Sequence, residues 1–208
     1  MKVGREMKRG LRYDFGLQAL MLIPVGVSLN VVGYQLCTIL KLPVFIDQIG
    51  TYLVAMVAGP WVGLMTGFLG NVVNGMLNPV AIPYGLVSMS IGLFAGYFSR
   101  FKFFNHLIGM IVACGVLTVV SAGTAAIVTV FMFGGITGAG TDLVTAAFLA
   151  AGRQLWDSVF STNIITGTIN TILNFAISYL VVKRIPPRFL VKLNYGAPYI
   201  SKEVLKHG

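Results

Sequence analysis

The sequence predicts an all-α fold: an integral membrane bundle of six transmembrane helices, with the N and C termini in the cytoplasm. Three observations predict it. First, 56% of the 208 residues are hydrophobic and only 10% are charged, whereas soluble domains carry about 25% charged residues. Second, the apolar residues form runs typical of membrane helices, divided by short glycine and proline breaks. Third, the basic residues gather on one side of the predicted spans.

The expected helices follow from the apolar runs and their breaks. The first run is too long for the apolar core of a signal peptide, so it is predicted to span the membrane, with Pro24 inside it. Gly59 and Pro60 separate a short second helix from the third, and a partial helix is expected at about 141–154. One membrane domain, 1–208, is expected, with cytoplasmic tails at about 1–14 and 184–208. The six spans are expected at about 15–40, 49–58, 61–77, 84–98, 107–133 and 156–182.

The placement of basic residues predicts the orientation. Of the 15 Lys and Arg residues, all but Lys41 and Arg153 fall on the side that holds both termini. Positive residues are retained on the cytoplasmic side of a membrane, so both termini are predicted to be cytoplasmic. The net charge of +9 does not indicate nucleic acid, because the basic residues lie between apolar runs rather than along one surface.

The sequence lacks the residues that several functional classes of protein need. The sequence has no phosphate-binding loop and no His-Glu-x-x-His motif, and Cys37 and Cys114 lie apart in apolar runs. No enzyme activity, metal site or cofactor is therefore expected; an intramembrane enzyme would need a base beside one of its serines, and His106 and His207 lie near the cytoplasmic boundaries. No span holds a pair of carboxylates that could relay protons. A transporter of this sequence would therefore need energy from a partner.

Small residues recur at helical spacing. Gly59, Gly63 and Gly67 share one face of the third helix, and the first helix carries Gly26, Ser28 and Gly33. Such faces let helix backbones approach closely in lipid. Two alternatives stay open: internal packing of the bundle, or a contact face for another membrane subunit. The second alternative makes these six residues the predicted partner contacts.

Asparagines form two rows at spacings that place them on one helix face. Asn71, Asn74 and Asn78 lie toward the outer end of the third helix, and Asn163, Asn170 and Asn174 lie along the sixth. An amide in lipid is costly unless it is hydrogen-bonded or faces a wet cavity. The outer amides favour a polar pocket, whereas Asn170 and Asn174 lie deeper, and the sequence leaves open whether they are structural.

Charged, amide and aromatic residues also recur near the predicted outer face. Trp156 alone could be an interfacial residue, Asp157 a partner of a helix dipole, and Asp47 a solvated loop acid. Together, such side chains provide apolar area and polar orientation for a small molecule. The predicted substrate-binding residues are Asp47, Gln48, Asn71, Asn74, Asn78, Tyr84, Arg153, Trp156, Asp157 and Asn163.

Three local segments resemble a known family. They are Leu-Pro-Val-Phe-Ile-Asp-Gln-Ile-Gly-Thr at 42–51, Ala-Gly-Pro-Trp-Val-Gly at 58–63 and Gly-Phe-Leu-Gly-Asn at 67–71. With the length and the six spans, the chain over about 15–188 resembles the substrate-specific (S) components of energy-coupling factor (ECF) transporters. The resemblance implies a pocket at the outer ends of helices four to six, capped by the loop that holds Asp47 and Gln48. It also implies a scaffold contact through an Ala-x-x-x-Ala pattern on helix one, from which this sequence departs.

The expected function follows from that resemblance. It implies a substrate-binding subunit of an ATP-driven importer in the bacterial plasma membrane, which captures a vitamin or a similar small micronutrient and delivers it inward. The implied partners are a membrane scaffold subunit and two cytoplasmic ATPase subunits. A compound like vitamin B6, riboflavin or a nucleoside suits the asparagines and aromatic residues, although no residue set selects one. The alternative is a stand-alone secondary transporter or channel for a small molecule.

Overall fold

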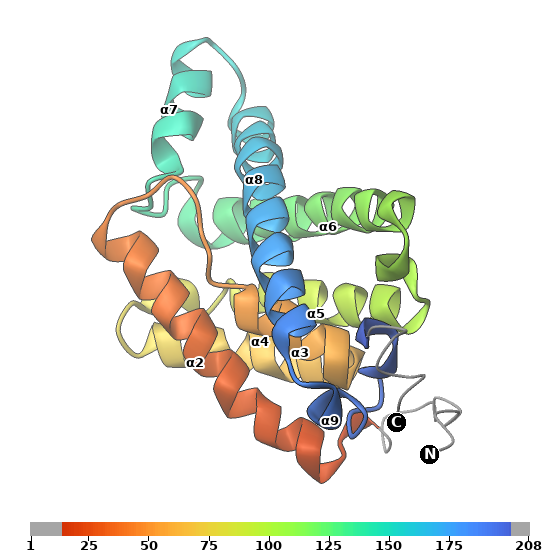
Figure 1. Cartoon of the computed structure of the whole chain (residues 1–208). Helices are drawn as coiled ribbons and strands as arrows, with labels where there is room; N and C mark the ends of the chain where they lie inside the picture. Colours follow the sequence, from red (N-terminus) through yellow and green to blue (C-terminus); the bar gives the residue numbers. More distant parts are fainter. Residues whose placement is uncertain (1–13, 201–208) are drawn as a thin grey trace.

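The computed structural model describes residues 14–200, which fold into helices without a β-strand. Figure 1 shows these helices in chain order, from α2 to the short C-terminal helices. The bounds agree with the expected spans to within about two residues. The principal helices are α2 (Leu17–Ile39), α3 (Ile49–Ala58), α4 (Pro60–Gly75), α5 (Gly85–Arg100), α6 (Leu107–Phe133), α7 (Asp142–Ala150) and α8 (Leu155–Arg184); the shorter ones are η1 (Pro79–Ala81), η2 (Phe103–Asn105), α9 (Pro187–Leu190) and η3 (Ala197–Tyr199).

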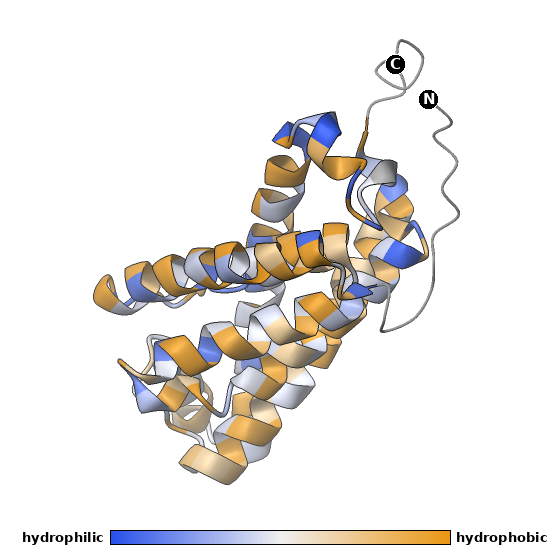
Figure 2. Cartoon of the chain, turned by 90° about the horizontal axis from the view of Figure 1, so that it is seen from below, coloured by the Kyte–Doolittle hydropathy of each residue, from blue (hydrophilic) through white to orange (hydrophobic). Residues whose placement is uncertain are grey.

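Three helices, α2, α6 and α8, are long and apolar enough to cross a membrane. Large apolar side chains lie exposed along all three, for example Val32 on α2, Ile111 on α6 and Leu180 on α8. Figure 2 shows apolar residues recurring along the helices. A soluble protein rarely exposes such extended apolar surface, so these helices fit a lipid environment. The chain is therefore a membrane protein.

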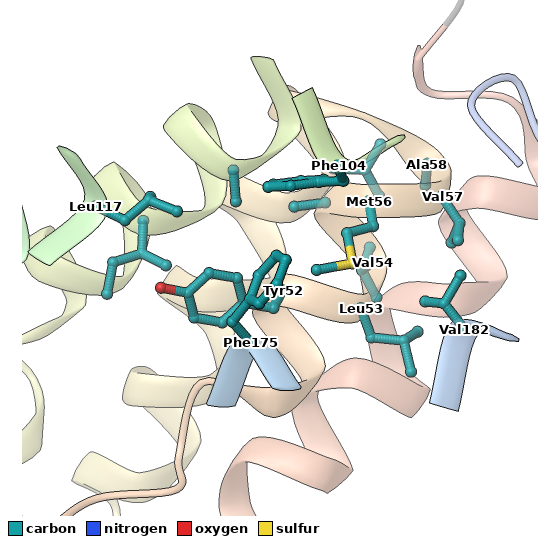
Figure 3. Packing of buried hydrophobic residues seen from close by; sticks show 14 of the residues in the cluster. Tyr52, Leu53, Val54, Met56, Val57, Ala58, Phe104, Leu117, Phe175 and Val182 are labelled. Atoms are coloured by element: carbon teal, nitrogen blue, oxygen red, sulfur yellow. The ribbon is translucent and has the colours of Figure 1, made fainter. Parts of the chain in front are cut away.

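The centre of the fold is α3, a short helix that is apolar on every side. All of its residues from Gly50 to Ala58 are buried, and α2, α4, α5 and α8 pack around it. A helix that is apolar all round lowers its free energy by burying every face, and this explains its central place. Figure 3 shows Tyr52, Val54 and Met56 inside the packed cluster, with Phe175 of α8 against Tyr52. Those two rings meet edge to face, with 6.2 Å between their centroids.

Both ends of α3 are satisfied by side chains from other elements. At its start, Asn30 of α2 accepts hydrogen bonds from the N–H groups of Gly50 and Thr51, at 2.8 and 3.3 Å. At its end, the Ser99 hydroxyl donates to the Met56 carbonyl oxygen at 2.7 Å. The terminal N–H and C=O groups of a helix have no partners within that helix, and water is scarce inside an apolar bundle. These side chains therefore make a buried ten-residue helix possible.

The predicted partner-contact glycines pack inside the chain. A Cβ on Gly63 would lie 2.5 Å from the Ala55 Cβ, and one on Gly67 would lie 2.6 Å from the Ser88 carbonyl oxygen. Gly26, Gly33 and Gly59 are also buried, against Thr66, the Ile46 backbone and Tyr195. The internal-packing alternative therefore describes these five residues in this structure.

Ser28 is the exposed member of the predicted partner-contact set. Its hydroxyl donates to the carbonyl oxygen of Pro24, at 2.9 Å, one turn earlier on α2. Pro24 lies inside α2, as expected. Of the predicted partner contacts, Ser28 alone remains accessible to another protein.

The segment after α8 is not the simple polar tail that was expected. Leu190 and Tyr195 are each 1% exposed and pack on the bundle. The Tyr195 N–H donates to the Val57 carbonyl oxygen at 3.2 Å, and its hydroxyl donates to Asp14 at 2.8 Å. Residues 185–200 therefore close the end of the bundle at which α3 ends. The basic residues expected at 2–12, together with Lys202, Lys206 and His207, lie outside the described residues.

Replacing Gly63 with Leu should destabilise the fold. The new side chain would meet Ala55 and the backbone of Gly92, and such overpacking costs about 3 kcal/mol or more. Thermal unfolding of the detergent-solubilised protein and its monodisperse fraction on gel filtration would measure the loss. Gly115→Leu is the matched control, because Gly115 on α6 is exposed with no atom within 4 Å of a new Cβ. Equal stability of the two variants would contradict the close contact.

Candidate functional site

A cavity of about 220 Å³ lies between the connection after α2, the loop before α7, and α5, α6 and α8. Figure 1 shows the connection after α2 passing close to the loop before α7 and then running to α3. The two segments touch where Gly140 meets the backbone of Leu42, leaving no room for a Cβ. They cover the cavity on one side, while Tyr52 and Ile91 belong to the packed core on the other.

Six of the ten predicted substrate-binding residues line this cavity. They come from four parts of the chain, and the first and last of these parts are more than a hundred residues apart in the sequence. The tertiary structure brings together Asp47, Gln48, Asn71, Asn78, Tyr84 and Asn163.

The other four predicted residues lie elsewhere. Asn74 is buried at 1% exposure and does not line the cavity, and its Oδ1 accepts no hydrogen bond from the described residues. Arg153, Trp156 and Asp157 are exposed around the start of α8. The Trp156 ring packs edge to face on Phe131, at 5.7 Å between centroids. The structure therefore does not bring these four predicted residues into the lining of the cavity.

Arg153 and Asp157 have other surroundings. The Arg153 guanidinium lies 5.0 Å from the Phe148 ring centroid. Asp157 occupies the first turn of α8, where its carboxylate interacts favourably with the helix dipole. These residues lie outside the cavity because of the path of the chain from α7 to α8. The helix ends at Ala150, and the chain turns before α8 begins at Leu155, so this corner points away from the cavity.

Hydrogen bonds fix most polar groups of the cavity wall. Gln48 Nε2 donates to the Ser88 hydroxyl at 2.7 Å, and the Asn71 amide donates to the same oxygen. The Tyr84 hydroxyl bonds the Thr129 hydroxyl at 2.6 Å, and the Tyr84 ring stacks on Phe133. These side chains are held in place without a ligand, as a preorganised small-molecule site requires.

Asn170 and Asn174, whose role the sequence leaves open, hold the connection after α2. Asn170 Oδ1 accepts the Phe45 N–H at 2.9 Å. Asn174 Oδ1 accepts the Gln48 N–H at 3.0 Å, and its amide donates to the Phe45 carbonyl oxygen at 2.8 Å. Both residues also line the cavity. They therefore anchor to α8 the loop that presents Asp47 and Gln48.

Asp47 is an acidic residue of the cavity wall with a perturbed pKa. It is partly buried and lines the cavity. Burial raises the pKa of its carboxyl from 3.8 to about 6, although its own backbone N–H and the Gln48 amide lower it in part. Asp142, which also lines the cavity, accepts bonds from the N–H groups of Thr137 and Gly138 at 2.9 and 2.6 Å. The two acids thus differ: loop N–H groups satisfy Asp142, while Asp47 has little compensation.

Sequence reasoning missed several cavity residues. Tyr34 accepts a hydrogen bond from the Asn78 amide at 2.9 Å, and Lys41 lies at the rim. Thr129, Thr162 and Thr166 look like ordinary residues of apolar spans, so no sequence signal identifies them. A lone amide inside a span is such a signal, and it could have identified Asn30 as a structural residue. Among the described residues, no group of three or more His, Cys, Asp or Glu side chains could hold a metal ion.

Asn174→Ala should release the connection after α2 from α8. It removes two hydrogen bonds to the loop backbone and leaves buried polar groups unpaired, so a loss of about 2–3 kcal/mol is expected. Thermal unfolding and proteolysis of the 41–48 segment would measure it. Asn163→Ala is the control, because the Asn163 amide bonds the Val159 carbonyl oxygen of its own helix. Equal losses in both variants would contradict the anchoring role.

Asp47→Asn should change how stability depends on pH. The raised pKa means that the folded protein favours the neutral carboxyl; this stabilisation is complete below pH 3.8 and is lost as the pH rises through about 6. From about pH 5 to pH 7.5, the wild type should lose about 1 kcal/mol relative to the variant. Unfolding temperatures of both proteins across this range would show the difference, and parallel curves would contradict the buried charge.

Comparison with known proteins places the chain in a family. No curated protein and no solved structure matches the chain significantly. Residues 18–182 match the family described as the substrate-specific component of an ECF transporter. The match spans the helices from α2 to α8 and every segment that lines the cavity. The chain therefore belongs to the family of substrate-specific components of ECF transporters.

Proposed function

We propose that the chain is the substrate-binding subunit of an ATP-driven importer that captures a vitamin or a similar small micronutrient in the cavity between α5, α6 and α8. The cavity is the observation that carries the proposal. It is concave, its wall mixes aromatic, amide and hydroxyl groups, and most of these polar groups are held by hydrogen bonds. Compounds like vitamin B6, riboflavin or a nucleoside have the rings and polar groups that such a wall accommodates.

The proposal includes an orientation. Six spans would place both termini and the Arg100–Lys102 connection in the cytoplasm, and the cavity toward the outside of a bacterial plasma membrane. The segments that cover the cavity belong to the side with few basic residues: Lys41 and Arg153 are the two on that side. Substrate would then enter past the 41–48 connection and the loop before α7. The whole chain would form one membrane domain.

Energy would come from partners. No described span holds a pair of carboxylates, and the sequence has no nucleotide-binding loop. The family description names a component of a transporter, so a scaffold subunit and two ATPase subunits would supply ATP hydrolysis. The exposed apolar faces of α2, α6 and α8 are available for lipid or for that scaffold.

The test is ligand binding by the purified chain. A bound small molecule should co-purify and be identified by mass spectrometry, and calorimetry should then give its affinity. Tyr84→Ala should weaken binding about ten-fold or more, because it removes a ring and a hydroxyl from the cavity wall. Trp156→Ala should bind normally, because Trp156 packs on Phe131 outside the cavity.

Three results would contradict the proposal. A folded chain that retains no vitamin or nucleoside would exclude the capture role. Uptake of the ligand into vesicles that contain this chain without ATPase or scaffold subunits would favour a stand-alone transporter instead. Weak binding by Trp156→Ala with normal binding by Tyr84→Ala would move the site to the outer corner near α8.

A further inference from the structure

Asp47 is a carboxylate on the cavity wall that lacks a cationic partner. Within residues 14–200 it forms no ion pair, and the one side chain that donates to it is Gln48, through Nε2 at a long 3.4 Å. A charge in surroundings of low dielectric is costly unless an opposite charge or several donors compensate it. The described residues therefore leave a negative charge uncompensated at this point of the cavity.

The other charges of the cavity wall do not compensate it. Asp142 adds a second negative charge, which the N–H groups of Thr137 and Gly138 satisfy. Lys41 is the one basic residue among the described lining residues, and it is exposed, with its amine in no ion pair. Two acids and one rim lysine give the cavity a negative potential, which attracts cations and repels anions.

The surroundings of Asp47 suit an organic cation. The Tyr34 and Phe45 rings, which line the cavity with it, lie 6.3 Å apart with an angle of 20° between their planes. Aromatic faces attract ammonium and protonated heterocyclic groups. The Oε1 atom of the neighbouring Gln48 is buried and accepts no hydrogen bond. The acceptor that this part of the wall offers to a donor on the ligand is the Asp47 carboxylate.

Size and ligand chemistry narrow the class. A volume of about 220 Å³ lies below the range of about 300–1,000 Å³ that holds drug-sized ligands, so one or two small rings fit better than a large fused system. A bare metal ion is disfavoured, because no group of three or more His, Cys, Asp or Glu side chains comes together in the described part of the chain.

We infer that the substrate is a small ring compound with a positively charged nitrogen, and that this nitrogen pairs with the Asp47 carboxylate beside Tyr34 and Phe45. The inference rests on the proposed function and makes its substrate class specific. The connection after α2 would present the charge, and Asn170 and Asn174 would fix its position through the loop backbone. An uncharged analogue would leave Asp47 unpaired, and an anionic one would be repelled, so the site would select by charge.

The experiment offers the purified full chain an equimolar mixture of three charge classes and identifies retained compounds by native mass spectrometry. The cations are pyridoxamine and thiamine, the neutral compounds are pyridoxine, riboflavin and adenosine, and the anions are biotin, pantothenate and pyridoxate. Retention of a cation, with pyridoxine and the anions left free, is the expected result. Retention of a neutral compound or an anion without a cation would overturn the inference while upholding the proposed function. Retention of none by a folded chain would contradict both.

Variants test the role of the carboxylate. Asp47→Asn should weaken binding of the retained cation at least ten-fold, because it removes the charge at nearly constant shape. Asp157→Asn makes the same change in net charge on the exposed first turn of α8, outside the cavity, and should bind as the wild type does. Equal affinity of Asp47→Asn and wild type, with folding checked by thermal unfolding, would overturn the pairing. An equal loss in both variants would assign the effect to net charge alone.

Discussion

The architecture depends on the complete burial of α3. This helix has ten residues, too few to cross a bilayer alone, and its terminal N–H and C=O groups end inside the bundle. Each unpaired group there would cost several kcal/mol. Asn30, Ser99 and Tyr195 supply missing partners from α2, α5 and the C-terminal segment. The surrounding elements are thus fixed relative to one another by the ends of a single helix.

The same constraint shapes the cavity. Asn174 and Ser178 hold the start of α3 and the loop before it, so Asp47 and Gln48 sit at a defined height on the wall. Close contacts at Gly26 and Gly33 bring α2 against this region. Glycine allows such an approach because it has no Cβ, and dispersion forces then replace the hydrophobic effect that is missing between helices in lipid. Small residues that resemble a docking face in the sequence therefore form internal contacts next to the cavity wall.

The sequence predicts best those features that depend on residues close together along the chain. Helix limits depend on local signals, such as Gly59 and Pro60 between α3 and α4, and they were predicted closely. The amide rows were recognisable because a polar group in an apolar span is costly unless it is paired or faces water. Arg153, Trp156 and Asp157 were grouped with the cavity because of their expected depth in the membrane. Depth alone does not determine which way a side chain faces. The turn between α7 and α8 points them away. Thr129 and Thr166 carry no distinguishing signal, because threonine is common in membrane helices and only packing places it on a cavity.

The sequence by itself determined that this is an all-helical membrane protein, where its helices begin and end, and its resemblance to the family to which it belongs. These properties depend on composition, on local breaks and on motifs, all of which are written along the chain. Only the tertiary structure decided that Asn170 and Asn174 hold the loop carrying Asp47, that the glycines pack inward, and that six of the predicted residues share one cavity. These facts depend on which faces of distant helices meet. The pairing of helix faces minimises unpaired polar groups and voids over the whole bundle. No local segment of the sequence therefore determines which faces pack together.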